Sequence, residues 1–177
     1  MIFKKTKFEG VYIIEPKKLE DERGFFARTW DMDDFEKNGL NSKILQCSIS
    51  HTKTKGTIRG LHYQISPFEE TKIIRCTRGK IYDVIIDLRK DSPTYKKWGS
   101  FDLSSENYNM LYVPEGFAHG FQSLEDNIEM FYQMTQIFQS EYNKGIRWDD
   151  PIFNISWPLD VAIISKKDKN WELFKQI

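Results

Sequence analysis

The chain has 177 residues, enough for one domain with a substantial buried core, and we expect a single domain over residues 1–177. Its 26 basic and 26 acidic side chains cancel, which gives no support for nonspecific binding to nucleic acid or to an anionic membrane. Because no window approaches the roughly 18 apolar residues of a membrane span and the N-terminus lacks the apolar run of a signal peptide, we expect a cytoplasmic protein.

Short strands separated by turn signals follow one another along most of the chain. The stretch Ile81–Leu88, rich in β-branched and aromatic residues, is typical of a buried strand. An amphipathic helix is predicted at Met32–Asn38, ended by Gly39, and Gly79-Lys80 is typical of a hairpin turn. We expect strands at Gly10–Pro16, Arg23–Trp30, Lys43–Thr52, Thr57–Gln64, Thr71–Arg78, Lys80–Asp87, Lys97–Leu103, Asn109–Val113, Gly120–Leu124 and Ile128–Ile137.

Strands about 8 to 12 residues apart favour an antiparallel sandwich or barrel, and we expect a jelly roll. The segment from Gly145 differs, because it mixes tryptophans with prolines, and this composition indicates an irregular segment packed on the main body. The predicted fold class is therefore all-β: an antiparallel jelly-roll barrel with a few short helices and an irregular C-terminal segment. Inward side chains at the open mouth of such a barrel can form a pocket.

Two histidines lie in segments that point to such a pocket. In Arg59-Gly60-Leu61-His62, an imidazole that titrates near neutral pH follows an arginine whose planar fork binds anions. Gly60 between them would let an anion approach the backbone. Taken alone, a histidine in an apolar strand is more often a core residue. The second segment, Val113–Phe121, contains a Pro-x-Gly-x-x-His turn that delivers His119 onto the start of a strand.

The Val113–Phe121 segment resembles the second metal-binding motif of the cupin jelly rolls. The first cupin motif normally holds two histidines and a glutamate, whereas this chain has His62 alone, with Glu69 or Glu70 as acidic candidates. A metal usually needs three or four well-placed ligands, so we expect a cupin-type barrel without a catalytic metal. A metal-dependent cupin oxygenase that binds iron through His62 and His119 is the rival interpretation.

Four strings in a fixed order carry a more specific resemblance. Together they are similar to the nucleotide-sugar 3,5-epimerases typified by dTDP-4-dehydrorhamnose 3,5-epimerase. The resemblance implies metal-independent epimerisation at C3 and/or C5 of a nucleotide-linked 4-keto-6-deoxyhexose, without a redox cofactor, in rhamnose-type deoxysugar synthesis. It also implies a homodimer with exchanged N-terminal strands. The strings are Asp21–Phe26, Arg59–Gln64, Val113–Phe121 and Gly145–Pro151.

The same resemblance implies four catalytic residues. His62 is the base, and Asp168 orients and charges its imidazole. Tyr132 is the acid on the opposite face of the sugar, and Lys72 stabilises the enolate oxygen. Without the resemblance, Tyr132 would be assigned to core packing, Lys72 to a solvated strand edge and Asp168 to the surface.

For the nucleotide, the resemblance implies cations at Arg23, Arg59 and Lys167, assisted by His119, and a stacking ring at Phe138. Further substrate contacts are expected at Gln46, Arg28, Ser48 and Asn143. The dTDP enzymes usually carry Glu, Asn, Tyr and Glu where this chain has Arg28, Ser48, Phe138 and Asn143.

These differences leave several functions open. A dTDP-linked sugar is the favoured substrate, and another nucleotide or sugar is the alternative. A 3-only or 5-only epimerase and a 3,4-ketoisomerase share the enolate chemistry and are close rivals. A noncatalytic sugar-nucleotide binding module is a further rival from another class.

Overall fold

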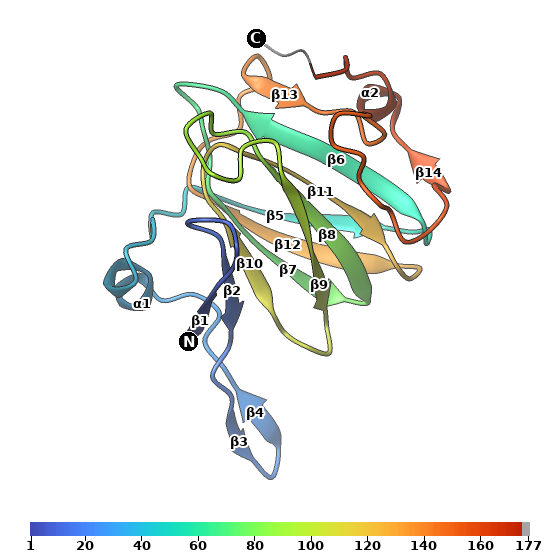
Figure 1. Cartoon of the computed structure of the whole chain (residues 1–177). Helices are drawn as coiled ribbons and strands as arrows, with labels where there is room; N and C mark the ends of the chain where they lie inside the picture. The colour runs from blue at the N-terminus through green and yellow to red at the C-terminus, as the bar shows by residue number, and fades with distance from the viewer. Residues whose placement is uncertain (175–177) are drawn as a thin grey trace.

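The computed structural model describes residues 1–174, and most of its regular structure consists of antiparallel strands (Figure 1). Two short helices are α1 (Met32–Lys37) and α2 (Lys166–Lys169). The strands are β1 (Ile2–Lys5), β2 (Tyr12–Glu15), β3 (Leu19–Asp21), β4 (Gly24–Phe26), β5 (Gln46–Thr52), β6 (Thr57–Gln64), β7 (Lys72–Arg78), β8 (Lys80–Asp87), β9 (Trp98–Ser104), β10 (Met110–Val113), β11 (Phe117–Ser123), β12 (Ile128–Met134), β13 (Asn143–Gly145) and β14 (Ile163–Ile164).

Two sheets face each other around the main core. The first runs β1-β2-β10-β7-β12-β5, and the second runs β13-β6-β11-β8-β9 with β14 added beside β6. Apolar side chains from both sheets, such as Ile74 and Met130 from the first and Ile85 and Phe121 from the second, are buried between them. This arrangement confirms the predicted all-β, antiparallel jelly roll.

The hairpin predicted at Gly79-Lys80 is wrong. Strand β7 pairs with β10 and β12 in the first sheet, whereas β8 pairs with β9 and β11 in the second. Gly79 therefore carries the chain from one sheet to the other. Its φ is +74°, and an added Cβ would lie 2.7 Å from Cγ2 of Ile128, so the crossing needs glycine for both conformation and space.

The N-terminal part differs most from expectation. The strand expected at Arg23–Trp30 is reduced to β4, which pairs with β3 in a hairpin that projects from the body (Figure 1). Helix α1 lies where a helix was predicted, with Asp31 as its N-cap. Its buried Phe35 packs against residues of β2, β7 and β10, including Tyr112.

The C-terminal segment packs on the main body, as predicted, where it adds β14 to the second sheet and places α2 beside that sheet. Ile146 and Phe153 form a buried cluster with residues of β6, β8 and β11. The backbone N–H of Phe174 donates to Asp150 at 2.6 Å, which ties the end of the described chain to the body. Strand β14 pairs with Thr57 and Ile58 and leads directly into α2, which places α2 beside β6.

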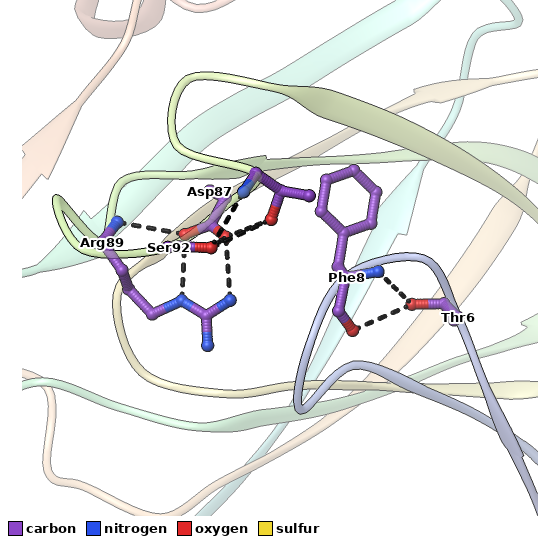
Figure 2. A network of polar contacts seen from close by, with 6 residues as sticks. Thr6, Phe8, Asp87, Arg89 and Ser92 are labelled. Atoms are coloured by element: carbon purple, nitrogen blue, oxygen red, sulfur yellow. Dashed lines mark hydrogen bonds and ion pairs between the residues drawn. The ribbon is translucent and has the colours of Figure 1, made fainter.

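The connection from β8 to β9 is held by one buried carboxylate (Figure 2). Asp87 accepts hydrogen bonds from Nε and Nη2 of Arg89 at 2.9 and 2.8 Å, and from the hydroxyls of Ser92 and Thr94 at 2.6 Å each. Burial raises the pKa of Asp87, but these donors outweigh it and hold the pKa at about 2. The Arg89 guanidinium stacks 4.5 Å from the ring centre of Phe117, the first residue of β11, and so supports the strand that carries His119.

Residues 1–174 include no helix with the length and apolar character that crossing a membrane requires.

Candidate active site

A cavity of about 590 Å³ lies between the inner faces of the two sheets. The first sheet contributes residues from β5, β7 and β12, the second contributes residues from β6 and β11, and the C-terminal segment closes one side. Seven residues predicted from the sequence line this cavity. They are His62, Lys72, Tyr132, Asp168, Arg59, His119 and Lys167.

The presence of both Arg59 and His62 in one cavity departs from regular strand geometry. Side chains three residues apart on a strand point to opposite faces. Here the pairing of β6 with β11 shifts register between His119 and Phe121, as in a β-bulge, and both side chains reach the cavity. Gly60 was expected to let an anion approach the backbone. Instead, strand β11 approaches it, because a Cβ added at Gly60 would lie 2.6 Å from Cα of Gly120.

His62 and Asp168 form a close pair. The Nε2 atom of His62 lies 2.6 Å from a carboxylate oxygen of Asp168, whose other oxygen accepts the Gly60 N–H at 3.3 Å. The Asp168 side chain is 6 % exposed, and its N–H is capped by the Ser165 hydroxyl. Burial raises the pKa of Asp168, but the bonds from His62, Gly60 and Ser165 outweigh it and the pKa is lowered. An ionised carboxylate on Nε2 favours the neutral tautomer whose lone pair is on Nδ1.

Tyr132 lies across the cavity on β12, edge-on to His119 with ring centres 6.2 Å apart. Burial, with a contribution from the neighbouring charge of Asp83, raises the pKa of the Tyr132 phenol far above its usual value. The phenol therefore keeps its proton at neutral pH, and this group can donate but not remove a proton there.

Lys72 is held by a residue whose role sequence reasoning missed. Its Nζ atom lies 3.0 Å from a carboxylate oxygen of Glu70 and donates to the backbone carbonyl of His62 at 3.4 Å. Both side chains are largely buried, 14 % exposed for Lys72 and 9 % for Glu70. The sequence interpretation considered Glu70 only as a metal ligand, whereas here it is the counter-ion of Lys72.

Asp83 is a second residue that sequence reasoning missed. This carboxylate on β8 is fully buried, and one oxygen lies 2.8 Å from Nε2 of His119. Its other oxygen has no partner within residues 1–174. Burial raises the pKa of Asp83, although His119 and Lys72 oppose the shift. The signal in the sequence was an aspartate inside the apolar run Ile81–Leu88, since a buried carboxylate requires a partner.

The two histidines of the cavity are cross-strand partners, which places both in the same region of the second sheet. Each imidazole, however, is bonded to a carboxylate, His62 to Asp168 and His119 to Asp83. Within the described part of the chain, no three His, Cys, Asp or Glu side chains gather as a group that could hold a metal ion.

Six predicted substrate-binding residues do not line the cavity of their own chain. Arg23 is 84 % exposed and pairs with Asp21 in the projecting hairpin, and Arg28 pairs with Asp31 just beyond it. The other four belong to elements next to the cavity: Ser48 is the cross-strand partner of Tyr132, Gln46 accepts the Phe138 N–H at 2.9 Å, and Asn143 pairs with Gln64.

The fold and these side chains define a cupin-type jelly roll with a cavity lined by titratable side chains, and comparison with known proteins gives the family. The family model for dTDP-4-dehydrorhamnose 3,5-epimerase matches residues 5–176. The enzyme of that name from Methanothermobacter thermautotrophicus is 43 % identical over 177 residues, which cover 98 % of this chain and 95 % of the relative. The chain therefore belongs to the dTDP-4-dehydrorhamnose 3,5-epimerase family and is an isomerase that acts on carbohydrates.

Solved structures agree over nearly the whole chain. The dTDP-4-dehydrorhamnose 3,5-epimerase of Bacillus anthracis, with TDP and PPi bound, superposes with a TM-score of 0.94 at 38 % identity, covering 98 % of this chain and 99 % of that one. The dTDP-6-deoxy-D-glucose-3,5-epimerase of Legionella pneumophila, in complex with dTDP-4-keto-L-rhamnose, superposes with a TM-score of 0.90 at 35 % identity, covering 97 % and 92 %.

Proposed function

We propose that this chain epimerises a nucleotide-linked 4-keto-6-deoxyhexose of the dTDP-4-dehydro-6-deoxyglucose type at C3 and C5, through an enolate and without a metal. The observation that carries the proposal is the His62–Asp168 pair, which shares one cavity with Tyr132 and Lys72. The names of the matched relatives support a dTDP-linked substrate in deoxysugar synthesis. We propose a cytoplasmic location and a single functional domain for the same chain.

The proposed reaction needs a base, an acid and a group that stabilises negative charge. His62 removes the proton on the carbon beside the ketone, and the electron pair moves into an enolate whose charge develops on O4. The Lys72 ammonium stabilises that oxygen. The Tyr132 phenol then delivers its proton to the opposite face of the carbon, which inverts it. Solvent removes the proton from His62 and restores the one on Tyr132, and the cycle repeats at the second carbon.

The nucleotide is the less constrained part of the substrate. Arg59, Lys167 and His119 supply cationic or donor groups to the cavity for the diphosphate. A thermal-shift panel of dTDP, CDP, GDP and UDP tests the base, since a ligand at 100 times its Kd stabilises the native state by about 2.7 kcal/mol. We expect dTDP to give the largest shift. A larger shift with another nucleotide would transfer the proposal to that nucleotide.

We further propose that the chain acts as a homodimer in which the β3–β4 hairpin of one subunit completes the cavity of the other. The hairpin exposes Leu19, Phe25 and Phe26 to solvent, at 59, 40 and 66 %. It also carries Arg23, which its own cavity does not use. Exposed apolar surface on a projecting arm favours burial against a partner.

Solvent exchange tests the chemistry directly. The protein is incubated in D₂O with dTDP-4-keto-6-deoxyglucose, and NMR follows deuterium at C3 and C5. We expect exchange at both carbons and near-complete loss of exchange in His62→Asn. Exchange at a single carbon would indicate a 3-only or 5-only epimerase, and exchange at neither would defeat the epimerase proposal. Unchanged exchange in His62→Asn would exclude His62 as the base.

A further inference from the structure

The segment that follows α2 places an aromatic ring in contact with two residues of the cavity. The indole of Trp171 lies edge-on to the His62 imidazole, with ring centres 6.4 Å apart and planes at 68°. The Nζ atom of Lys167 lies 5.3 Å from the centre of the same indole. Trp171 thus contacts both the proposed base and a proposed diphosphate ligand.

The strand next to His62 leaves the space that this indole occupies. Gly145 on β13 is the cross-strand partner of His62, and paired residues on neighbouring strands point to the same face of a sheet. An added Cβ at Gly145 would fall inside the Trp171 indole. The φ of Gly145 lies outside the left-handed region, so this strand position needs glycine for space and not for conformation.

The segment is fixed at both ends, which prevents the ring from moving freely. Before Trp171, Ser165 caps α2 and Asp168 bonds to His62. After it, the N–H of Phe174 is bound by Asp150, and the Phe174 ring packs edge-on against Phe153 at 5.3 Å. The same short stretch of chain therefore presents a carboxylate to Nε2 of His62 and an indole to its ring.

We propose that Trp171 is a positioning residue that, with the space left by Gly145, holds the His62 imidazole against Asp168 and orients Lys167. The proposal rests on the proposed function, in which His62 is the base. The indole N–H is buried without a hydrogen-bond partner in the described residues, so the ring acts through its shape and π face. A phenylalanine at position 171 should therefore keep the positioning role, whereas an alanine should lose it.

Two variants remove the ring from this place by different routes: Trp171→Ala deletes it, and Gly145→Ala displaces it. We expect each to lower kcat about ten- to a hundredfold, because a small misplacement of a catalytic group has effects of that size. Trp171→Phe should stay within a few-fold of the wild type. Leu173→Ala, which truncates an exposed neighbour, is the matched control and should leave kcat unchanged. If Trp171→Ala does not fold, Gly145→Ala carries the same test.

A measurement on the free protein separates this proposal from the proposed function. The chain has three histidines, so long-range ¹H–¹⁵N NMR above the imidazole pKa can assign the tautomer of each. We expect one His62 tautomer, with its proton on Nε2, in the wild type and Trp171→Phe, and a mixture in Trp171→Ala and Gly145→Ala. If these two variants show a mixture of His62 tautomers but the wild type does not turn over the substrate, the proposed function is wrong and the positioning role stands. A single tautomer and wild-type kcat in Trp171→Ala would overturn the positioning role.

The double variant tests whether Gly145 and Trp171 act through the same space. In Gly145→Ala/Trp171→Ala, the new methyl group has the room that the indole vacated. We therefore expect its kcat to match that of Trp171→Ala, with no further loss. Losses that multiply would mean that Gly145 acts independently of the ring, and would overturn the proposed pairing.

Discussion

At the scale of single residues, the His62–Asp168 pair makes Asp168 a sensitive position. Asn keeps the shape of the side chain and an acceptor but removes the charge that fixes the imidazole tautomer and stabilises its protonated form. We expect Asp168→Asn to lower kcat by about a hundredfold or more. Steady-state kinetics, with circular dichroism to establish that the variant is folded, measure the effect. A variant as active as the wild type would show that the carboxylate does not assist His62.

Replacing Tyr132 should separate the exchange of the substrate proton with solvent from the inversion of the carbon. Because the raised pKa keeps its phenol protonated, Tyr132 acts in the proposed reaction only after His62 has formed the enolate. In Tyr132→Phe, His62 can still remove a proton and return a solvent deuteron to the same face. We expect deuterium incorporation with retained configuration and almost no epimer, measured by NMR in D₂O. His62→Asn is the control, since it should lose both exchange and inversion. Normal epimer formation by Tyr132→Phe would assign the acid to another group.

The position of the main catalytic candidates in one cavity could be predicted, because the four strings carry a family resemblance that implies all of them, although only His62 lies inside a string. The side chains that bond to these residues could not be predicted. Glu70 is two residues from Lys72, yet the sequence does not say that the two side chains meet. Asp83 and Trp171 are 36 and 109 positions from their histidine partners, and such contacts depend on sheet topology, which no local pattern records.

At the scale of elements, the positions of most strands followed from residue composition and turn signals, whereas strand partners did not. The bounds of β6 and β8 match the predicted ranges, because both are long and rich in strand-forming residues. The turn at Gly79 has the composition of a hairpin but joins two sheets, since a left-handed glycine serves both kinds of connection. The bulge that brings Arg59 and His62 to one cavity depends equally on the partner strand.

Asp87, in the connection between β8 and β9, should make the free energy of unfolding fall at acid pH. The pKa of Asp87 is about 2 in the folded protein, below its ordinary value of 3.8. A lowered pKa contributes stability above the unfolded value, and this stability is lost as pH falls from about 4 to about 2. Because Asp87 is fully buried, the contribution is about 2 kcal/mol.

Urea unfolding at pH 7, 4 and 2 measures this contribution. Asp87→Asn should be less stable than the wild type at pH 7 and should lose less stability between pH 4 and pH 2. Asp102→Asn is the matched control, since Asp102 forms an exposed ion pair with Lys80 that contributes little to stability. Curves for Asp87→Asn that run parallel to those of the wild type would contradict the assignment.

At the scale of the whole molecule, the β3–β4 hairpin lies away from the cavity of its own subunit. Figure 1 shows β3 and β4 projecting at the opposite end of the molecule from α2, which carries Asp168. Arg23 therefore cannot serve the cavity of its own chain without a large movement. In the proposed dimer this separation no longer matters, because the hairpin of one subunit reaches the cavity of the other.

Mixing two inactive variants tests this arrangement. His62→Asn lacks the base, and Arg23→Ala lacks the residue that the partner would supply, so each homodimer should be nearly inactive. After subunit exchange, a mixed dimer has one cavity with both residues intact. Random pairing makes half of the dimers mixed, and we expect about a quarter of the wild-type activity to return. His62→Asn mixed with Asp168→Asn is the control and should restore nothing, because these two residues serve the same cavity of one chain. No recovery with Arg23→Ala, in a mixture shown by mass spectrometry to contain mixed dimers, would mean that the hairpin does not complete the partner's site.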